Sequence, residues 1–143
     1  MVKNFFIQGA ISADFISREI AKHHTKKTIG AHSIFLGQVR EDIINSKFVK
    51  AIEYSTYEAM AFEQMNILRD DIFNKYELSC MHIFHSLGLV NAGDISLFVF
   101  VSSKHRRIAF DACEEVVELV KSKLPIWGKE IFHDNSYNWK VNH

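Results

Sequence analysis

Apolar and polar positions follow two different periods along this chain, one typical of strands and the other of helices. Short apolar or alternating runs predict five strands, over residues 5–7, 31–39, 51–57, 80–87 and 95–102. The last two runs are separated only by a polar turn at residues 91–94, which is too short for a helix. Neighbouring strands joined in this way favour antiparallel pairing.

Three helices are predicted from apolar residues that recur every three or four positions. A short N-terminal helix begins after Ser12, a residue type favoured as an N-cap, and ends near residue 22. Two long helices follow, one over residues 58–76 and one that ends before Pro125. Their apolar stripes are Ala61, Met65, Leu68, Ile72 and Tyr76 in the first and Ala109, Ala112, Cys113, Val116, Val117 and Val120 in the second. The predicted fold class is therefore α/β of the α+β type, with a mostly antiparallel sheet.

Composition narrows the class of protein. The chain has 143 residues, of which 48% are hydrophobic and 13% aromatic, with a single proline, so a sizeable core is expected rather than disorder. No repeat or Pro/Gly/Ser-rich linker divides it, which predicts a single domain over residues 1–143. The 17 basic and 17 acidic residues cancel, which argues against a protein that coats nucleic acid or an anionic membrane. Any anion site must therefore be local.

The cysteines, the apolar runs and the histidines argue against a disulfide-bonded, membrane-spanning, secreted or metal-binding protein. Cys80 and Cys113 form no CxxC pair and are expected to be buried thiols of a reducing compartment. No run approaches the roughly 20 apolar residues of a membrane span. Residues 1–15 lack the long apolar segment of a signal peptide, so we expect a cytoplasmic protein. The eight histidines show no HExxH or other close spacing, and no metal site is expected.

Three consecutive cations, His105, Arg106 and Arg107, stand at the start of the second long helix. A cation there opposes the helix dipole by about 0.3–1 kcal/mol per exposed charge, whereas a bound anion would reverse the effect. An arginine binds phosphate bidentately, and a histidine donates a hydrogen bond near neutral pH. The cluster predicts either an anion site or an exposed loop corner whose charge Asp111 offsets.

Two further cations have both a functional and an ordinary interpretation. Lys121 lies at the edge of its helix's apolar stripe, where its ammonium either reaches a cleft or stays solvated near the helix C-terminus. Arg40 follows a glycine-containing strand end and either faces a cleft or pairs with a neighbouring carboxylate, Glu41 or Asp42. Trp127, in a rigid turn after the second long helix, is expected to fill the core or an interface.

Four segments, taken in order, resemble the large, catalytic subunit of the molybdopterin synthase family. They are GAHSIFLGQVRED (30–42), IEYSTYEAMA (52–61), FHSLGLVNAGDISLFVFVSSKHRRIAFDA (84–112) and VELVKSKLPIWGKE (117–130). Each segment alone is a weak signal. The HR-x-x-AF pattern followed by K-x-x-x-P-x-W is specific in combination.

This resemblance implies an α/β-hammerhead-like fold and a homodimer that binds a small, ubiquitin-like sulfur-carrier subunit on each protomer, giving a heterotetramer. The carrier's C-terminal Gly-Gly tail, as a thiocarboxylate, would enter a pocket of the large subunit. It would supply two sulfurs to cyclic pyranopterin monophosphate, forming the dithiolene of molybdopterin. No permanently bound cofactor is implied, and the phosphate of the substrate is the anion that the basic cluster would bind.

The same resemblance assigns roles to individual residues. Lys121 matches the catalytic lysine beside the thiocarboxylate, and Arg40 and Phe35 match residues that bind substrate. His105 and Arg106 match the pair expected to contact phosphate or pterin, across the dimer interface.

One position departs from the family pattern, which usually has a second lysine directly after the tryptophan. Here that position is Gly128, and Lys129 follows it. Lys129 is the second catalytic residue if a local shift brings it into place. Three hypotheses follow: an active synthase subunit, a family member that binds the carrier with weak or no turnover, and an unrelated small anion-binding module.

Overall fold

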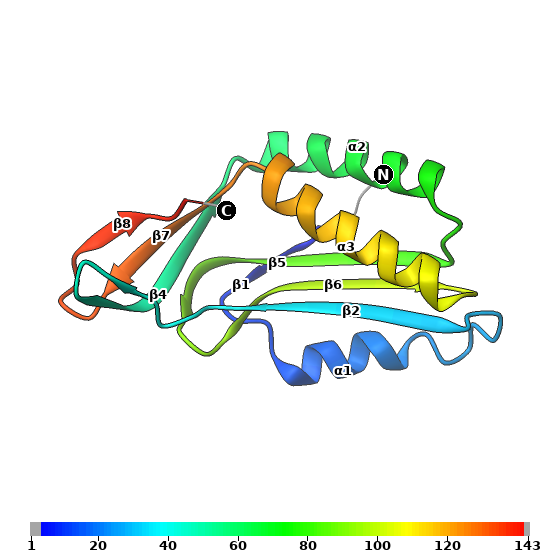
Figure 1. Cartoon of the computed structure of the whole chain (residues 1–143), viewed down its shortest axis with the longest axis horizontal. Coiled ribbons are helices and arrows are strands. Elements are labelled where there is room, and N and C mark those ends of the chain that lie inside the picture. The colour runs from blue at the N-terminus through cyan, green and yellow to red at the C-terminus, as the bar shows by residue number, and fades with distance from the viewer. Residues whose placement is uncertain (1–3, 142–143) are drawn as a thin grey trace.

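The computed structural model describes residues 4–141, within which a sheet of eight strands is flanked by three helices (Figure 1). The strands are β1 (Phe6–Gln8), β2 (Ala31–Gln38), β3 (Ile43–Ile44), β4 (Lys47–Thr56), β5 (Cys80–Asn91), β6 (Ile95–Ser103), β7 (Ile126–Phe132) and β8 (Tyr137–Trp139). The helices are α1 (Ala13–Ala21), α2 (Glu58–Lys75) and α3 (Arg106–Lys123). The strand order is β2-β6-β5-β4-β7-β8, with β1 beside β5 and β3 beside β4. Among the strands of residues 4–141, only β1 pairs in parallel, which confirms the predicted α+β class.

β6 lies in the interior of the sheet and is buried on both faces. Because successive side chains of a strand point to opposite sides, Leu97, Val99 and Val101 pack towards α2 and α3. Phe98 and Phe100 pack on the other side, with residues of α1. Each of these five side chains is at most 3% exposed. The continuous apolar run of β6 is therefore explained by helices on both faces of the sheet.

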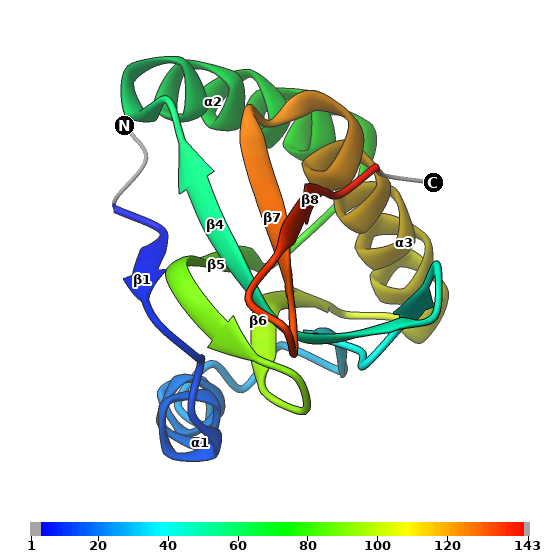
Figure 2. The same ribbon diagram turned by 90° about the vertical axis from the view of Figure 1, so that its left-hand side faces the viewer.

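The helices cover the two faces of the sheet unequally, as Figures 1 and 2 show. α2 and α3 lie together over one face, and the predicted stripes of both are buried there, apart from Tyr76, which is half-buried just after α2. α1 alone covers the other face, with Phe15 and Ile16 against Phe98 and Phe100. Ser12 caps α1 as predicted, because its side-chain oxygen accepts a hydrogen bond from the Phe15 N–H at 3.1 Å.

β5 joins two parts of the sheet because it changes partners along its length. Its first half pairs with β6 up to His85, and its last residues, from Gly88, pair with β4. Gly88 adopts φ +80°, a conformation that favours glycine, at the point where the strand changes partners. Beyond it, β3, β4, β7 and β8 form a smaller part of the sheet at the left of Figure 1, with its own apolar cluster around Val49 and Ile52.

The chain after α3 differs most from the expectations. β3, β7 and β8 were not predicted, and the segment expected to be a turn after Pro125 continues directly into β7, which pairs with β4. Trp127 is 51% exposed on that strand, so the core interpretation of its side chain is wrong. Cys80 and Cys113 are free and buried, as expected. Among residues 4–141, no helix is both long and apolar enough to cross a membrane.

The packing of α2 gives a direct test of the fold. Ile72 is fully buried against the sheet, whereas Ile67 of the same helix is 48% exposed. Ile72→Ala should lower the free energy of unfolding by about 2–5 kcal/mol, because it removes buried methyl groups and leaves a cavity. Ile67→Ala should change it by no more than about 0.5 kcal/mol. Urea unfolding of both variants measures the difference; equal effects would contradict this placement of α2.

Candidate functional site

Two adjoining hollows lie where the smaller part of the sheet meets α3 and the end of β2. Their volumes are about 140 and 690 Å³. Arg40, Lys121 and Lys140 line both hollows, so three cations stand at the place where the hollows join. Phe35 lines the larger one. Of the site residues expected from the sequence, the structure thus brings together Lys121, Arg40 and Phe35.

Arg40 reaches the hollows because the end of β2 is irregular. The register between β2 and β6 shifts between Gly37 and Gln38, and such a bulge redirects the residues that follow it. A side chain at Gly37 would crowd Leu97, since its Cβ would lie 3.2 Å from the Leu97 Cβ. Arg40 Nε also lies 3.3 Å from an Asp42 carboxylate oxygen. Both interpretations of Arg40 therefore apply, since it pairs with Asp42 and lines the hollows.

Lys121 has an altered acid–base character. Desolvation of its ammonium lowers its pKa below the ordinary lysine value, and the positive charges of Lys140 and Arg40 lower it further. The carboxylate of Glu118, one turn earlier on α3, partly opposes this shift. A lysine with a lowered pKa gives up and regains a proton more readily near neutral pH, which suits proton transfer to a reacting group.

Three polar side chains line the smaller hollow beside Lys121. The Tyr54 hydroxyl and the Ser96 hydroxyl are 3.1 Å apart, and the ring of Tyr54 meets the His85 ring edge-on at 4.9 Å. His85 is buried, and burial lowers its pKa to about 4, so its ring is neutral at pH 7. Its Nδ1 donates to the Ser86 carbonyl at 2.8 Å, which leaves Nε2 as a hydrogen-bond acceptor. These residues were not singled out as site residues in the sequence, because only the tertiary fold brings them together beside Lys121.

Lys140 is the third cation of the site, and sequence analysis missed it. Its backbone N–H donates to the Gly128 carbonyl at 2.8 Å, directly after β8 pairs with β7. This contact places Lys140 over the position where the family pattern has a second lysine. A Cβ built on Gly128 would lie 3.7 Å from the Lys140 Cβ and only 3.0 Å from Ile52 Cγ2. Little room therefore remains for a side chain at residue 128.

Lys129 lies outside both hollows. Because neighbouring residues of a strand face opposite sides, Lys129 points away from the side on which Gly128 lines the smaller hollow. Its ammonium lies 3.3 Å from a Glu53 carboxylate oxygen and 4.7 Å from the centre of the Tyr137 ring. β7 pairs with β4 without a shift across this region, so the local shift that would bring Lys129 into place is not observed.

His105 and Arg106 do not join the other site residues within one chain. His105 is the N-cap of α3, and both side chains are exposed at the end of the helix opposite Lys121. An α-helix rises about 1.5 Å per residue, which puts Arg106 roughly 22 Å along the axis from Lys121. Arg107 lies 3.9 Å from Asp111, so the charge offset expected for an exposed corner is present.

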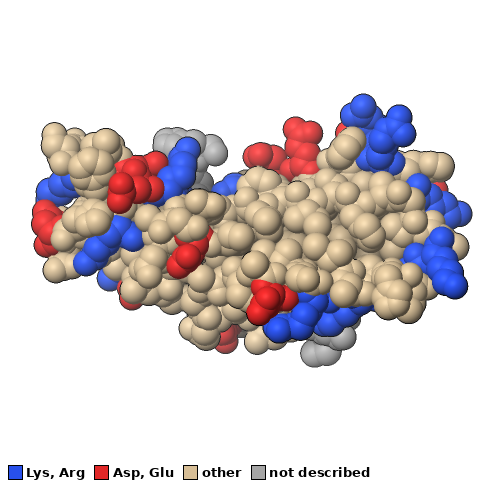
Figure 3. All heavy atoms as spheres, turned by 90° about the horizontal axis from the view of Figure 1, so that it is seen from below, with Lys and Arg blue, Asp and Glu red and all other residues tan. Residues whose placement is uncertain are grey.

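Charged side chains of both signs occur on the surface and around the hollows. On the face that Figure 3 shows, lysine and arginine side chains form separate groups among acidic and uncharged ones. The larger hollow itself mixes charges, since Asp42, Glu118 and Glu130 line it together with the three cations. The smaller hollow has the same three cations and no carboxylate among its lining residues, so positive charge predominates there.

A mostly antiparallel α+β fold with a lysine-centred, cation-lined hollow defines the class of this protein. The family model described as MoaE protein matches residues 10–123. The chain belongs to this family.

Similar proteins carry a consistent description. The molybdopterin synthase catalytic subunit of Pyrococcus abyssi is 32% identical over 124 residues, which cover 87% of this chain and 83% of that protein. The subunit of Bacillus subtilis is 36% identical over 82% of this chain and 74% of its own length. The crystal structure of molybdopterin synthase from Staphylococcus aureus superposes with a TM-score of 0.84, at 29% identity, and covers 99% of this chain and 100% of that one.

The charge coupling at the junction of the hollows is testable by NMR. Lys140→Ala should raise the pKa of Lys121 towards the ordinary lysine value, because a neighbouring positive charge that disfavours the protonated form is removed. Titration of protein labelled with ¹³C in its lysine side chains measures this pKa. Lys123→Ala, which removes an exposed lysine from the last turn of α3, is the control and should leave it unchanged. An unaltered Lys121 pKa in Lys140→Ala would contradict the described arrangement.

Proposed function

We propose that this protein is the catalytic subunit of a molybdopterin synthase. In this function it transfers sulfur from a thiocarboxylated carrier protein to cyclic pyranopterin monophosphate, forming the dithiolene of molybdopterin. The observation that carries the proposal is the convergence of Lys121, Arg40 and Lys140 on two joined hollows. One hollow suits a narrow peptide tail, and the other is large enough for a pterin phosphate.

Lys121 has the central chemical role in this proposal. The carrier's thiocarboxylate sulfur attacks a carbon of the substrate, and as this carbon–sulfur bond forms the carbon–oxygen bond to the phosphate breaks. Water then adds to the acyl carbon of the resulting thioester and the acyl–sulfur bond breaks, so that the sulfur stays on the substrate and the carrier leaves as its carboxylate. Negative charge develops on the acyl oxygen of the tetrahedral adduct. A cation fixed next to the acyl group stabilises that charge, and the lowered pKa of Lys121 favours proton donation to the adduct. The sulfur comes from the partner, so neither cysteine of this chain takes part.

Arg40 and Phe35 serve substrate binding. Arg40 offers a guanidinium to the phosphate of the substrate, and Asp42 holds it at the rim of both hollows. Phe35 is half-buried in the wall of the larger hollow and offers an apolar surface for the pterin ring.

Lys140 supplies the second cation in place of Lys129. It lies over Gly128, whereas Lys129 is occupied by Glu53 and Tyr137 on the other side of β7. With Lys140 in this role, the site has as many lysines as the family pattern has. The proposal therefore favours an active enzyme over a family member that only binds the carrier.

His105 and Arg106 contribute from a second copy of the chain. Their exposure and their distance from Lys121 leave them unable to contact the same small substrate within one protomer. A homodimer that brings the start of α3 to the partner's hollow completes the phosphate site. Two such protomers with two carriers form a heterotetramer; a protein of the same fold from Helicobacter pylori is described as a complex of subunits 1 and 2 of molybdopterin-converting factor.

Reconstitution with thiocarboxylated carrier and cyclic pyranopterin monophosphate tests the function. The wild-type protein should form molybdopterin, and Lys121→Ala should lower the rate by about 10²–10⁴-fold while still binding the carrier. Lys140→Ala should lower it more than Lys129→Ala does, and Lys123→Ala serves as the control. A carrier complex that yields no product would favour the binding-only alternative, and a larger loss in Lys129→Ala would contradict the role of Lys140.

Mixed dimers test the contribution of the second copy. Lys121→Ala and Arg106→Ala should each be nearly inactive alone, since each lacks a residue in both sites of its dimer. After subunit exchange, one site of a mixed dimer regains both residues, so activity should return. Native mass spectrometry verifies that mixed dimers have formed; if they have and the mixture stays inactive, the two residues do not act in a shared site.

A further inference from the structure

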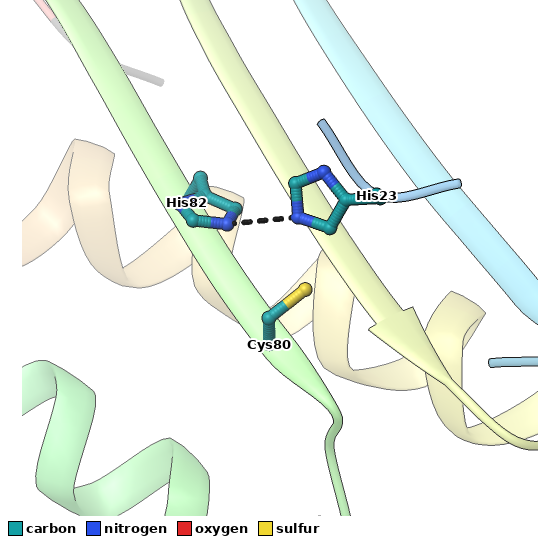
Figure 4. Close-up of side chains that lie close together, drawn as sticks. All are labelled: His23, Cys80 and His82. Atoms are coloured by element: carbon teal, nitrogen blue, oxygen red, sulfur yellow. Dashed lines mark hydrogen bonds between the residues drawn. The ribbon is translucent and has the colours of Figure 1, made fainter. Parts of the chain in front are cut away.

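We propose that His23, Cys80 and His82 bind one divalent transition-metal ion of the zinc class, with a fourth position left for water or a small ligand. Figure 4 shows the two imidazole rings facing each other, with the Cys80 sulfur pointing towards them. One ligand atom from each of the three residues lies within 4.8 Å of the other two. The linear spacing of the histidines gave no sign of this group, because His23 belongs to a distant part of the chain.

The distances suit tetrahedral coordination. Zinc binds histidine nitrogen at about 2.0–2.1 Å and cysteine sulfur at about 2.3 Å, so its ligand atoms lie roughly 3.3–3.6 Å apart. His23 Nε2 and His82 Nε2 are already 3.1 Å apart. The Cys80 sulfur lies within 4.8 Å of a ring nitrogen of each histidine, so it would move closer to them on metal binding. Two nitrogens and one sulfur form a donor set that zinc prefers to magnesium or calcium.

The fold holds the three ligands in place from two sides. Cys80 and His82 are alternate residues of β5, so both point to the same face of the sheet. His23 follows α1 and is only 5% exposed. Its ring packs on Phe100 with the ring centres 4.7 Å apart. A metal ion here would connect the end of α1 to the first half of β5.

The proton positions also suit metal binding. His23 Nδ1 donates to the Glu19 carbonyl at 2.8 Å, the outer hydrogen bond that orients many metal-bound histidines, and this leaves Nε2 for the metal. On binding, the Cys80 thiol would release its proton to solvent, and the His82 proton would reside on Nδ1.

The surroundings provide access and charge. The three residues line a cleft of about 640 Å³ that shares no lining residue with the two hollows around Lys121. The carboxylate of Glu19, which pairs with Lys22, lines the same cleft. Lys22 and Arg69 also line the cleft, and their positive charges would disfavour a cation there. The negative charges of the Cys80 thiolate and the Glu19 carboxylate would counter this repulsion. The proposed metal site is therefore separate from sulfur transfer and can be tested without carrier or substrate.

Titration of the full-length, metal-free protein with Co²⁺ and Zn²⁺ tests the proposal. One equivalent of Co²⁺ should give the near-ultraviolet thiolate band and the visible bands of a tetrahedral site, and Zn²⁺ should displace it and raise the melting temperature. Cys80→Ser should remove the thiolate band and weaken Zn²⁺ binding at least about 10-fold. His82→Asn provides a second variant should Cys80→Ser fail to fold.

Matched controls come from the same chain. Cys113→Ser removes the other buried thiol, and His24→Gln removes the exposed histidine next to His23; both should bind one equivalent like the wild type. The proposal is overturned if the wild type shows no thiolate band, or if the band survives in Cys80→Ser. It is also overturned if Cys113→Ser weakens binding as much as Cys80→Ser does. In those cases the His23–His82 contact is an ordinary hydrogen bond between two rings that pack on Phe100.

Discussion

The burial of β6 on both faces is the constraint on which the rest of the structure depends. An antiparallel sheet commonly leaves one face to water, but here Phe98 and Phe100 need cover on the side opposite Leu97, Val99 and Val101. α1 supplies that cover, and α2 with α3 covers the other side. Burying five large apolar side chains in one strand stabilises the fold by roughly 1.5–3 kcal/mol for each, before conformational entropy is subtracted. The direction of α3, and so the position of Lys121, follows from this packing.

The site arises where that packing ends. β5 leaves the main part of the sheet at Gly88 and carries the chain into the smaller part, where β4, β7 and β8 extend past the end of α3. The hollows lie at this junction because neither α3 nor the smaller sheet fills it. Arg40, just after β2, and Lys121, in the last turn of α3, therefore place their charges at the rim of this space.

Sequence patterns predicted the elements whose stability comes from burial. Both long helices and the central strands have apolar periods. The helix residues that these periods predict to be buried are buried in the structure, apart from half-buried Tyr76. β8 was not predicted because all its residues are exposed and its order comes from pairing with β7, a long-range contact that leaves no local period. Lys140 was missed for the same reason. His23, Cys80 and His82 were missed because only the tertiary fold brings α1 to β5. Lys129 was assigned because it directly follows Gly128 in the sequence. The alternation of side chains along β7, however, turns Lys129 away from the hollows.

Lys140 lies beside Gly128, the position at which the family pattern usually has a lysine. A Cβ at residue 128 would lie 3.0 Å from Cγ2 of buried Ile52, so a side chain there would require Ile52 to move by a few tenths of an ångström. With glycine, the chain after β8 lies close enough to bond to the Gly128 carbonyl, and Lys140 occupies the surface above it. The cation is thus carried by a neighbouring segment rather than by β7 itself. Both Lys140 and Arg40 lower the pKa of Lys121, so the segment after β8 contributes to the electrostatics around this lysine.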